Sequence, residues 1–123
     1  VNQGGHLDNA QLVTLISEAR VRFFKSLGYT EGDVAGHPIV VGDLVAQYKS
    51  EGFHGETMRI RMIPQFYNQY GFDLVYRMDC LERAREVARG KVGIVFIDRH
   101  SRKVAPMPQA FMDQIGKLIA RTL

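Results

Sequence analysis

The strongest pattern in the chain is a stripe of apolar residues at helical spacing between residues 9 and 27. Asp8 and Asn9 lie at its start, and such side chains cap helices because their oxygens accept unpaired amides of the first turn. The pattern predicts a helix that begins at Asn9 or Ala10 and ends before Gly28, which suits a left-handed C-terminal cap. Its apolar side is broad, so we expect the rest of the fold to cover it deeply. The residues on that side are Leu12, Val13, Leu15, Ile16, Ala19, Phe23, Phe24 and Leu27.

Four later segments have the composition and alternation of β-strands, namely residues 38–48, 56–65, 72–79 and 87–98. The second alternates between two faces, with Met58, Ile60 and Met62 on one and Arg59 and Arg61 on the other. Pro64 lacks an amide donor, so we expect this strand to bulge or end near it. Residues 92–97 are continuously apolar, which is typical of a central strand.

The segments between the strands predict a surface loop at residues 29–37 and turns at 52–55, 67–71 and 81–86. A shorter helix is expected at residues 109–122, where Phe111, Ile115, Leu118 and Ile119 share a face. One long helix followed by four antiparallel-type strands indicates an α+β fold with the helix against one face of the sheet. A chain of 123 residues has the size of one domain, so residues 1–123 are expected to form a single unit.

Composition narrows the classes of partner. The net charge is +3, but the basic residues are spread along the chain, so we do not expect nucleic acid binding. No apolar run approaches the roughly 18–20 residues of a membrane span. Cys80 is the single cysteine, which excludes an intrachain disulfide and suits a cytoplasmic location, where it would be a small buried apolar residue. Four scattered histidines and one cysteine offer no metal-ligand spacing, so no metal is expected.

Residues 4–10, Gly-Gly-His-Leu-Asp-Asn-Ala, resemble the Gly-His-Val-Asn-Asn-Ala turn of hotdog-fold acyl-CoA thioesterases of the 4-hydroxybenzoyl-CoA thioesterase type. The similarity continues through residues 18–24, 40–48 and 88–98, and so covers nearly the whole chain. The resemblance implies a hotdog fold, in which an antiparallel sheet wraps around one long central helix and residues 1–5 end a first strand. It also implies hydrolysis of an acyl-CoA thioester to free acid and CoA, with no cofactor beyond the CoA of the substrate.

Thioester hydrolysis needs a polarised carbonyl, and the N-terminus of a helix can stabilise the oxyanion that develops on it. The resemblance gives this role to a backbone amide at Asn9, and Gly4 and Gly5 would let the substrate approach the backbone closely. Relatives usually carry an Asp, as base or nucleophile, four residues before the His. Here that position is Asn2, which can orient a water molecule but cannot take its proton.

Three other residues could supply the missing base. His6 has a suitable unperturbed pKa near 6.5, although a turn-stabilising hydrogen bond explains it equally well. Glu18 lies at a helix depth where some hotdog thioesterases place a carboxylate, and its alternative is a solvated ion pair with Arg22. Asp43 interrupts an apolar strand, which an edge position also explains. We favour Glu18 over Asp43 as the base, with His6 as a positioning group.

Arg83, Arg85, Arg89 and Lys91 flank the region where relatives hold the CoA nucleotide, and arginine matches the geometry of phosphate. Residues 40–48 are apolar enough to pair edge to edge, so we expect a homodimer or a dimer of dimers. Two alternatives remain open. A non-catalytic acyl- or CoA-binding module is made credible by Asn2, and a hydratase or dehydratase is suggested by His37-Pro38 and Gly42. The acyl group is not readable from the sequence.

Overall fold

The computed structural model describes residues 9–53 and 55–122, with side chains described as far as residue 118. Helix α1 (Asn9–Ser26) comes first in these residues, and helix α2 (Gln109–Thr122) comes last. Between them lie strands β1 (Ile39–Tyr48), β2 (Met58–Gln65), β3 (Gly71–Cys80) and β4 (Arg85–Phe96). The predicted helices and strands are thus confirmed, whereas the expected first strand at residues 1–5 lies outside the described residues.

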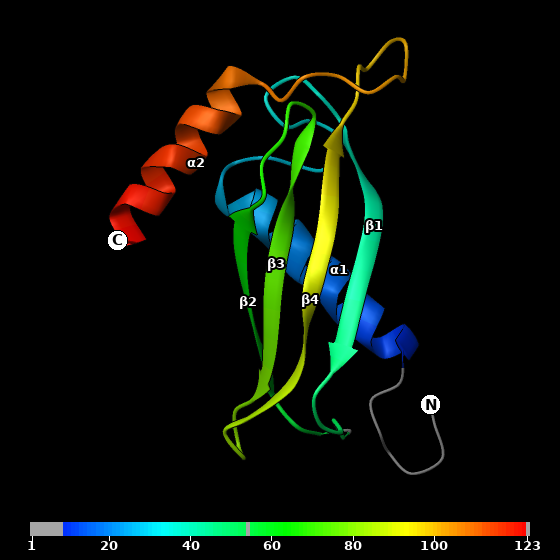
Figure 1. Cartoon of the computed structure of the whole chain (residues 1–123), viewed down its shortest axis with the longest axis vertical. Coiled ribbons are helices and arrows are strands. Elements are labelled where there is room, and N and C mark those ends of the chain that lie inside the picture. Colours follow the sequence, from blue (N-terminus) through cyan, green and yellow to red (C-terminus); the bar gives the residue numbers. More distant parts are fainter. Residues whose placement is uncertain (1–8, 54, 123) are drawn as a thin grey trace.

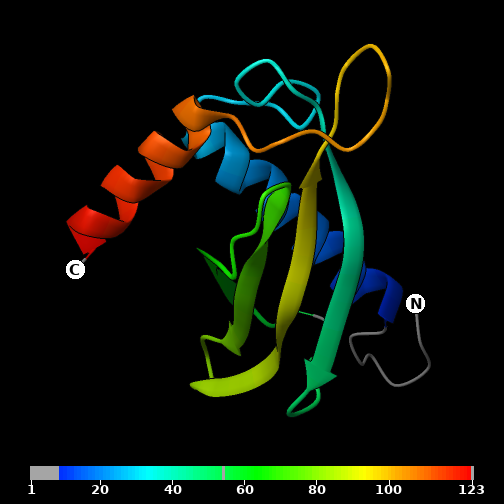
Figure 2. The same cartoon turned by 45° about the horizontal axis from the view of Figure 1, so that its top comes forward.

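The four strands form one antiparallel sheet in the order β1-β4-β3-β2. Figure 1 shows α1 crossing one face of this sheet diagonally, and Figure 2 shows α2 leaving the end of the sheet at which β4 finishes. We call the side that faces α1 the inner face and the opposite side the outer face. The α+β arrangement expected from the pattern, with the helix on one sheet face, is confirmed.

The core lies between α1 and the inner face. Alternate residues of β3 are buried there, namely Phe72, Leu74, Tyr76 and Met78, because successive strand residues point to opposite faces. β4 is a central strand as predicted and contributes Val92, Ile94 and Phe96. Along β2, the predicted alternation is also confirmed, since Met58, Ile60 and Met62 are half-buried on the inner face.

The prediction that α1 is deeply covered is wrong for part of its apolar side. Leu12, Ile16 and Phe24 are buried, but Val13, which was predicted on that side, is 43% exposed. Val21, an apolar residue that the prediction did not include, is 46% exposed. A helix lying on one sheet face buries only the stripe that points at that sheet, and these valines lie beside the stripe. The side of α1 that carries them is therefore open in a single chain.

The end of α1 has the predicted glycine cap. Gly28 has a φ of 89°, and its amide donates to the Lys25 carbonyl while the Tyr29 amide donates to the Phe24 carbonyl, each at 2.9 Å. This is the paired hydrogen bonding of a Schellman motif. The following segment was predicted as a surface loop, but Val34 within it is fully buried, so the loop also contributes to the core.

Helix α2 is anchored at its first turns. Phe111 is fully buried, and its ring lies 5.3 Å from Phe72 and 5.3 Å from Phe96, centroid to centroid. Ile115 is buried as well, whereas Leu118 on the same predicted face is 36% exposed. The side chain of Ile119 lies outside the described part of the chain. The apolar face of α2 is thus buried near its start, and Leu118 further along it is partly exposed.

Three local predictions concern a proline, a turn and the cysteine. β2 is an edge strand of the described sheet and ends one residue after Pro64, as expected of a proline there. β4 already begins at Arg85, so the predicted charged turn at residues 81–86 is two residues shorter. Cys80 is a buried free thiol, as predicted.

Candidate functional site

Four of the predicted site residues lie outside the described part of the chain: Asn2, Gly4, Gly5 and His6. Their roles stay predictions. Asn9 is the first residue of α1, so its backbone lies at the positive end of the helix dipole, as the proposed oxyanion site requires. The first turn of α1 holds no acidic side chain that would compete for this end.

Tyr48, which the sequence did not single out, lies against this helix end. It is the last residue of β1, and its hydroxyl donates a hydrogen bond of 2.9 Å to Oδ1 of Asn9. This bond joins the end of the edge strand to the beginning of α1. The only sequence signal was an aromatic residue at the end of a strand, and strand register alone does not show that it reaches the helix.

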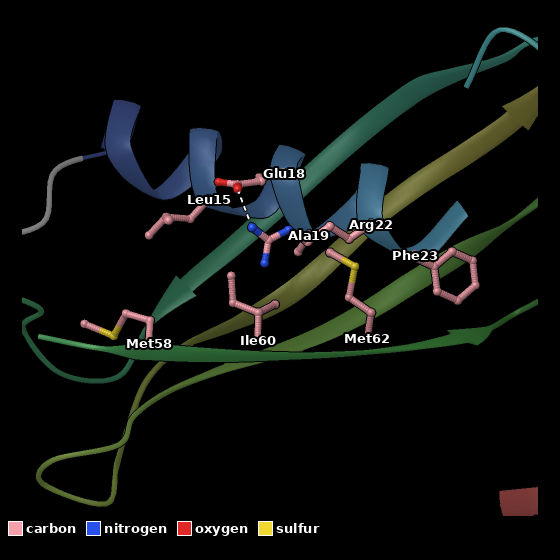
Figure 3. Close-up of a pocket in the computed structure, with 8 residues that line it drawn as sticks. All are labelled: Leu15, Glu18, Ala19, Arg22, Phe23, Met58, Ile60 and Met62. Atoms are coloured by element: carbon pink, nitrogen blue, oxygen red, sulfur yellow. Dashed lines mark hydrogen bonds and ion pairs between the residues drawn. The ribbon is translucent and has the colours of Figure 1, made fainter. Parts of the chain in front are cut away.

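A groove of about 470 Å³ runs along α1 on its β2 side. Figure 3 shows its two walls, with Met58, Ile60 and Met62 rising from β2 toward Leu15, Ala19 and Phe23 on α1. Six of its eight lining residues are apolar, and the remaining two are Glu18 and Arg22. The groove could hold an uncharged part of a ligand, and the Glu18 carboxylate would then lie at the rim beside it.

Glu18 lies at this rim in an ion pair with Arg22, with 2.7 Å between Oε1 and Nη2 (Figure 3). Both side chains are mostly exposed, at 55% and 76%. The solvated ion pair weighed against a catalytic role is therefore present, and it places the carboxylate beside the groove. Glu18 lies nine positions after Asn9 on the helix, which corresponds to about 13 Å along the axis at 1.5 Å per residue.

Asp43 lies elsewhere, on the outer face of the sheet. A register shift between Val41 and Asp43 marks a bulge in β1, and the Asp43 carboxylate lies over Gly93 of β4, where a Cβ would meet it at 2.1 Å. Its Oδ2 is 3.2 Å from Nζ of Lys91. Glu18 and Asp43 are therefore on different sides of the molecule, and β1 is an edge strand among the described residues.

The four cations expected to hold CoA phosphates are not gathered in one place. Lys91 lies between Asp43 and Asp73, and its hydrogen bond with Asp43 raises the pKa of its ammonium above the usual range. Arg89 forms a two-pronged ion pair with Glu86, both bonds at 2.6 Å. A carboxylate therefore already accompanies each of these two side chains.

Arg83 and Arg85 lie near the β3–β4 turn, around another carboxylate, Glu56. Arg85 donates to Oε1 of Glu56 at 3.0 Å and is only 25% exposed, so it ties this turn to the segment before β2. Arg83 lies 3.7 Å from the same carboxylate and is 72% exposed. Arg83 is thus the more accessible of the two for an anionic ligand.

Other classes of site find little support in residues 9–53 and 55–122. No group of three or more metal-ligating side chains occurs there. No helix among these residues is long and apolar enough to cross a membrane. His37, which suggested a dehydratase turn, is 3.2 Å through Nδ1 from the backbone carbonyl of Ile97, so it tethers the loop before β1 to the end of β4.

Comparison with protein families gives one decisive match. The model of the thioesterase-like superfamily matches residues 1–115. The chain belongs to this superfamily. A comparison with curated protein sequences gives no significant match.

Solved structures of other proteins share the fold of this chain. A 1,4-dihydroxy-2-naphthoyl-CoA thioesterase from Synechocystis superposes with a TM-score of 0.83 at 18% identity, covering 96% of this chain and 88% of that one. A DHNA-CoA thioesterase from Staphylococcus aureus gives 0.82 at 18%, covering 98% and 83%. A thioesterase complexed with coenzyme A and Zn from Thermus thermophilus gives 0.81 at 20%, covering 96% and 85%. The predicted hotdog fold is confirmed.

Proposed function

We propose that the protein hydrolyses acyl-CoA thioesters to a free acid and CoA. The superfamily match over residues 1–115 carries this proposal, and the N-terminus of α1 gives it a chemical basis. Water adds to the thioester carbonyl, and the backbone amide at Asn9 stabilises the negative charge on its oxygen. The thiolate of CoA then leaves and takes up the proton that the water lost.

Glu18 is our candidate for the base that accepts that proton. It lies beside an apolar groove that suits an acyl group, and general-base catalysis contributes roughly 10²–10⁴-fold to a rate. The separation of about 13 Å from Asn9 along α1 is much longer than a glutamate side chain. The two groups can therefore serve one carbonyl only if they come from different protomers.

A dimer that shares its sites is consistent with the open side of the fold. β1 is an edge strand of the described sheet, and four of its apolar side chains are exposed: Val40, Val41, Val45 and Tyr48. Val13 and Val21 of α1 are exposed as well. An apolar edge strand can pair with a second copy of itself. We propose a homodimer or a dimer of dimers, and sedimentation that shows only monomer at micromolar concentration would contradict it.

A non-catalytic acyl- or CoA-binding module is the second candidate. Two observations favour it, namely Asn2 at the position of the relatives' Asp and the ion pair that already occupies Glu18. In both cases we propose a cytoplasmic protein, since the buried thiol of Cys80 fits a reducing compartment. The His37 contact gives no reason to prefer a dehydratase.

Thiol release from a panel of acyl-CoA esters tests the proposal. We expect turnover by the wild type and a loss of at least about tenfold in kcat for Glu18→Gln, which keeps the shape and removes the charge. Glu51→Gln is the matched control, because Glu51 is an exposed carboxylate in the turn after β1. If the wild type binds acyl-CoA esters but releases no thiol, the binding module is the correct assignment. If Glu18→Gln is folded and fully active, Glu18 is not the base.

A further inference from the structure

One side chain from the sheet reaches the start of α1. Figures 1 and 2 show the first turn of α1 beside the last residues of β1. There the Tyr48 hydroxyl donates a hydrogen bond of 2.9 Å to Oδ1 of Asn9, which lies 39 positions earlier in the chain. A phenol hydroxyl carries a single proton, and this bond uses it. The bond therefore ties the side chain of Asn9 to the end of the edge strand.

The acceptor of this bond, the Asn9 side chain, is a competitor for the backbone amides beside it. The first amides of a helix have no partner within the helix. Asparagine often satisfies such amides, because its side-chain oxygen bonds to its own amide or to neighbouring ones. An amide occupied in this way cannot hold the oxygen of a thioester carbonyl. In this structure the bond from Tyr48 draws Oδ1 of Asn9 toward β1 instead.

The strand that carries Tyr48 is itself held from inside the core. Tyr76 of β3 is buried, and its hydroxyl donates a hydrogen bond of 2.9 Å to the backbone carbonyl of Val45 in β1. It reaches β1 across Gly90 of β4, the residue with which Tyr76 is paired. A Cβ on Gly90 would lie 2.8 Å from this hydroxyl and 1.9 Å from the Val45 oxygen, so only glycine leaves room. Tyr48 follows Val45 by three residues, so its backbone is fixed close to this bond.

We propose that Tyr48 is a positioning residue for the oxyanion site. Its hydroxyl holds the Asn9 side chain away from the backbone amides of the first turn, so that these amides stay open to the carbonyl oxygen of the substrate. The inference rests on the proposed thioester hydrolysis and deepens it, because it gives a task to a residue that does not touch the reacting atoms. A purely structural tether, or a hydroxyl that itself donates to the oxyanion, would give different results in the experiments below.

Thiol release from acyl-CoA by Tyr48→Phe, which keeps the apolar ring and removes the donor, is the first test. The freed Asn9 side chain then competes for the amides with the strength of a capping bond, so kcat should fall about two- to thirtyfold. KM should change by less than about twofold, because the amide bonds more strongly to the oxyanion than to the carbonyl of the bound substrate. Tyr70→Phe is the matched control, since Tyr70 in the β2–β3 turn is 42% exposed, as is Tyr48, and kcat should not change.

The same substitution in an Asn9→Ala background shows whether Tyr48 acts through Asn9. Asn9→Ala removes the competing side chain and keeps the backbone amide. Whatever kcat this variant has, adding Tyr48→Phe should change it no further, because no side chain is left to hold back. An equal loss of kcat in both backgrounds would mean that the hydroxyl acts on the substrate directly or only supports the fold, and it would overturn the proposal. An unchanged kcat in Tyr48→Phe alone would overturn it as well.

Hydrogen exchange of the backbone amides, followed by NMR, tests the same step without substrate. In Tyr48→Phe at least one first-turn amide of α1, such as that of Asn9, should exchange about two- to thirtyfold more slowly, because the Asn9 side chain now protects it. Loss of a purely structural tether would have the opposite effect, since a frayed turn exchanges faster. The proposal is overturned if no first-turn amide is slowed. A wild type that releases no thiol refutes the proposed hydrolysis, and the exchange rates still decide whether Tyr48 keeps these amides open.

Discussion

Asp79 is a buried carboxylate on the outer face of the sheet, and its replacement tests whether its ion pairs stabilise the fold. Its side chain is 8% exposed and accepts hydrogen bonds from Arg61 and Arg77. Asp79→Asn keeps the size of the side chain and removes its charge. Arg61 and Arg77 then face each other across the strand pair with no anion between them.

The magnitude follows from the burial of the carboxylate and the exposure of its partners. A hydrogen bond to a charged group contributes about 1.5–3 kcal/mol, and removing one partner of a buried ion pair costs about 3–5 kcal/mol. Arg61 and Arg77 are half exposed, so water screens both pairs. We therefore expect Asp79→Asn to lower the free energy of unfolding by about 1–3 kcal/mol at pH 7.

The effect should depend on pH. Burial raises the pKa of Asp79, but hydrogen bonds and charge interactions with Arg77 and Arg61 together lower it more, so the net pKa is below its ordinary value. A lowered folded-state pKa gives stability that is present above the unfolded pKa, about 3.9, and is lost as the pH falls through the folded pKa. The difference between wild type and Asp79→Asn should thus be full at pH 7 and shrink below about pH 4.

Urea unfolding followed by circular dichroism, from pH 7 down to the lowest pH at which the wild type is folded, measures this difference. Asp113→Asn on α2 is the control, because this exposed carboxylate should change stability by less than about 0.5 kcal/mol. A loss for Asp79→Asn below about 0.5 kcal/mol at pH 7, or one that is constant down to about pH 3, would refute the reasoning.

Three further outcomes are expected. Gly90→Ala should lower the free energy of unfolding in urea by about 1–3 kcal/mol, because the added Cβ would lie 1.9 Å from the Val45 carbonyl oxygen. In the control Gly32→Ala, the added Cβ meets nothing within 4 Å, so stability should hardly change. Phe111→Ala should cost about 3–5 kcal/mol by the same measurement, since a fully buried ring is removed, and a loss under about 1 kcal/mol would mean that α2 is not anchored there. Asn2→Asp should raise kcat if Asn2 orients the attacking water, and an unchanged kcat would exclude that role.

The fold was largely predictable because periodicity reports which face of an element is buried. Both helices and all four described strands were found within two residues at each end, and the alternation of Met58, Ile60 and Met62 set the inner face of β2. The error at Val13 has a physical origin. An apolar residue on a helix can pack against the sheet of its own chain or against a second chain, and periodicity does not distinguish these two cases.

The site was less predictable because it depends on contacts between distant elements. The Tyr48 hydroxyl bond to Asn9 spans 39 positions, and no local pattern at either residue announces it. In the alternation along β3, Asp79 falls on the outer face, where an exposed side chain is expected. It is buried instead, because Arg61 of β2 and Arg77 of β3 cover it. Spacing within one segment also could not show that Lys91 lies between Asp43 and Asp73.

The positions of Asn9 and Glu18 constrain how any hydrolysis by this fold is organised. A rigid helix holds the amide proposed to polarise the carbonyl and the candidate base about 13 Å apart, and no side-chain rotation closes that distance. β1 is an edge strand of the described sheet with exposed apolar side chains, and Val13 and Val21 of α1 are exposed as well. Association along β1 and α1 is the arrangement that could bring one protomer's helix end to its partner's carboxylate. The exposure of Val13, which the apolar pattern did not predict, is the result expected if a second copy covers this surface in the proposed dimer.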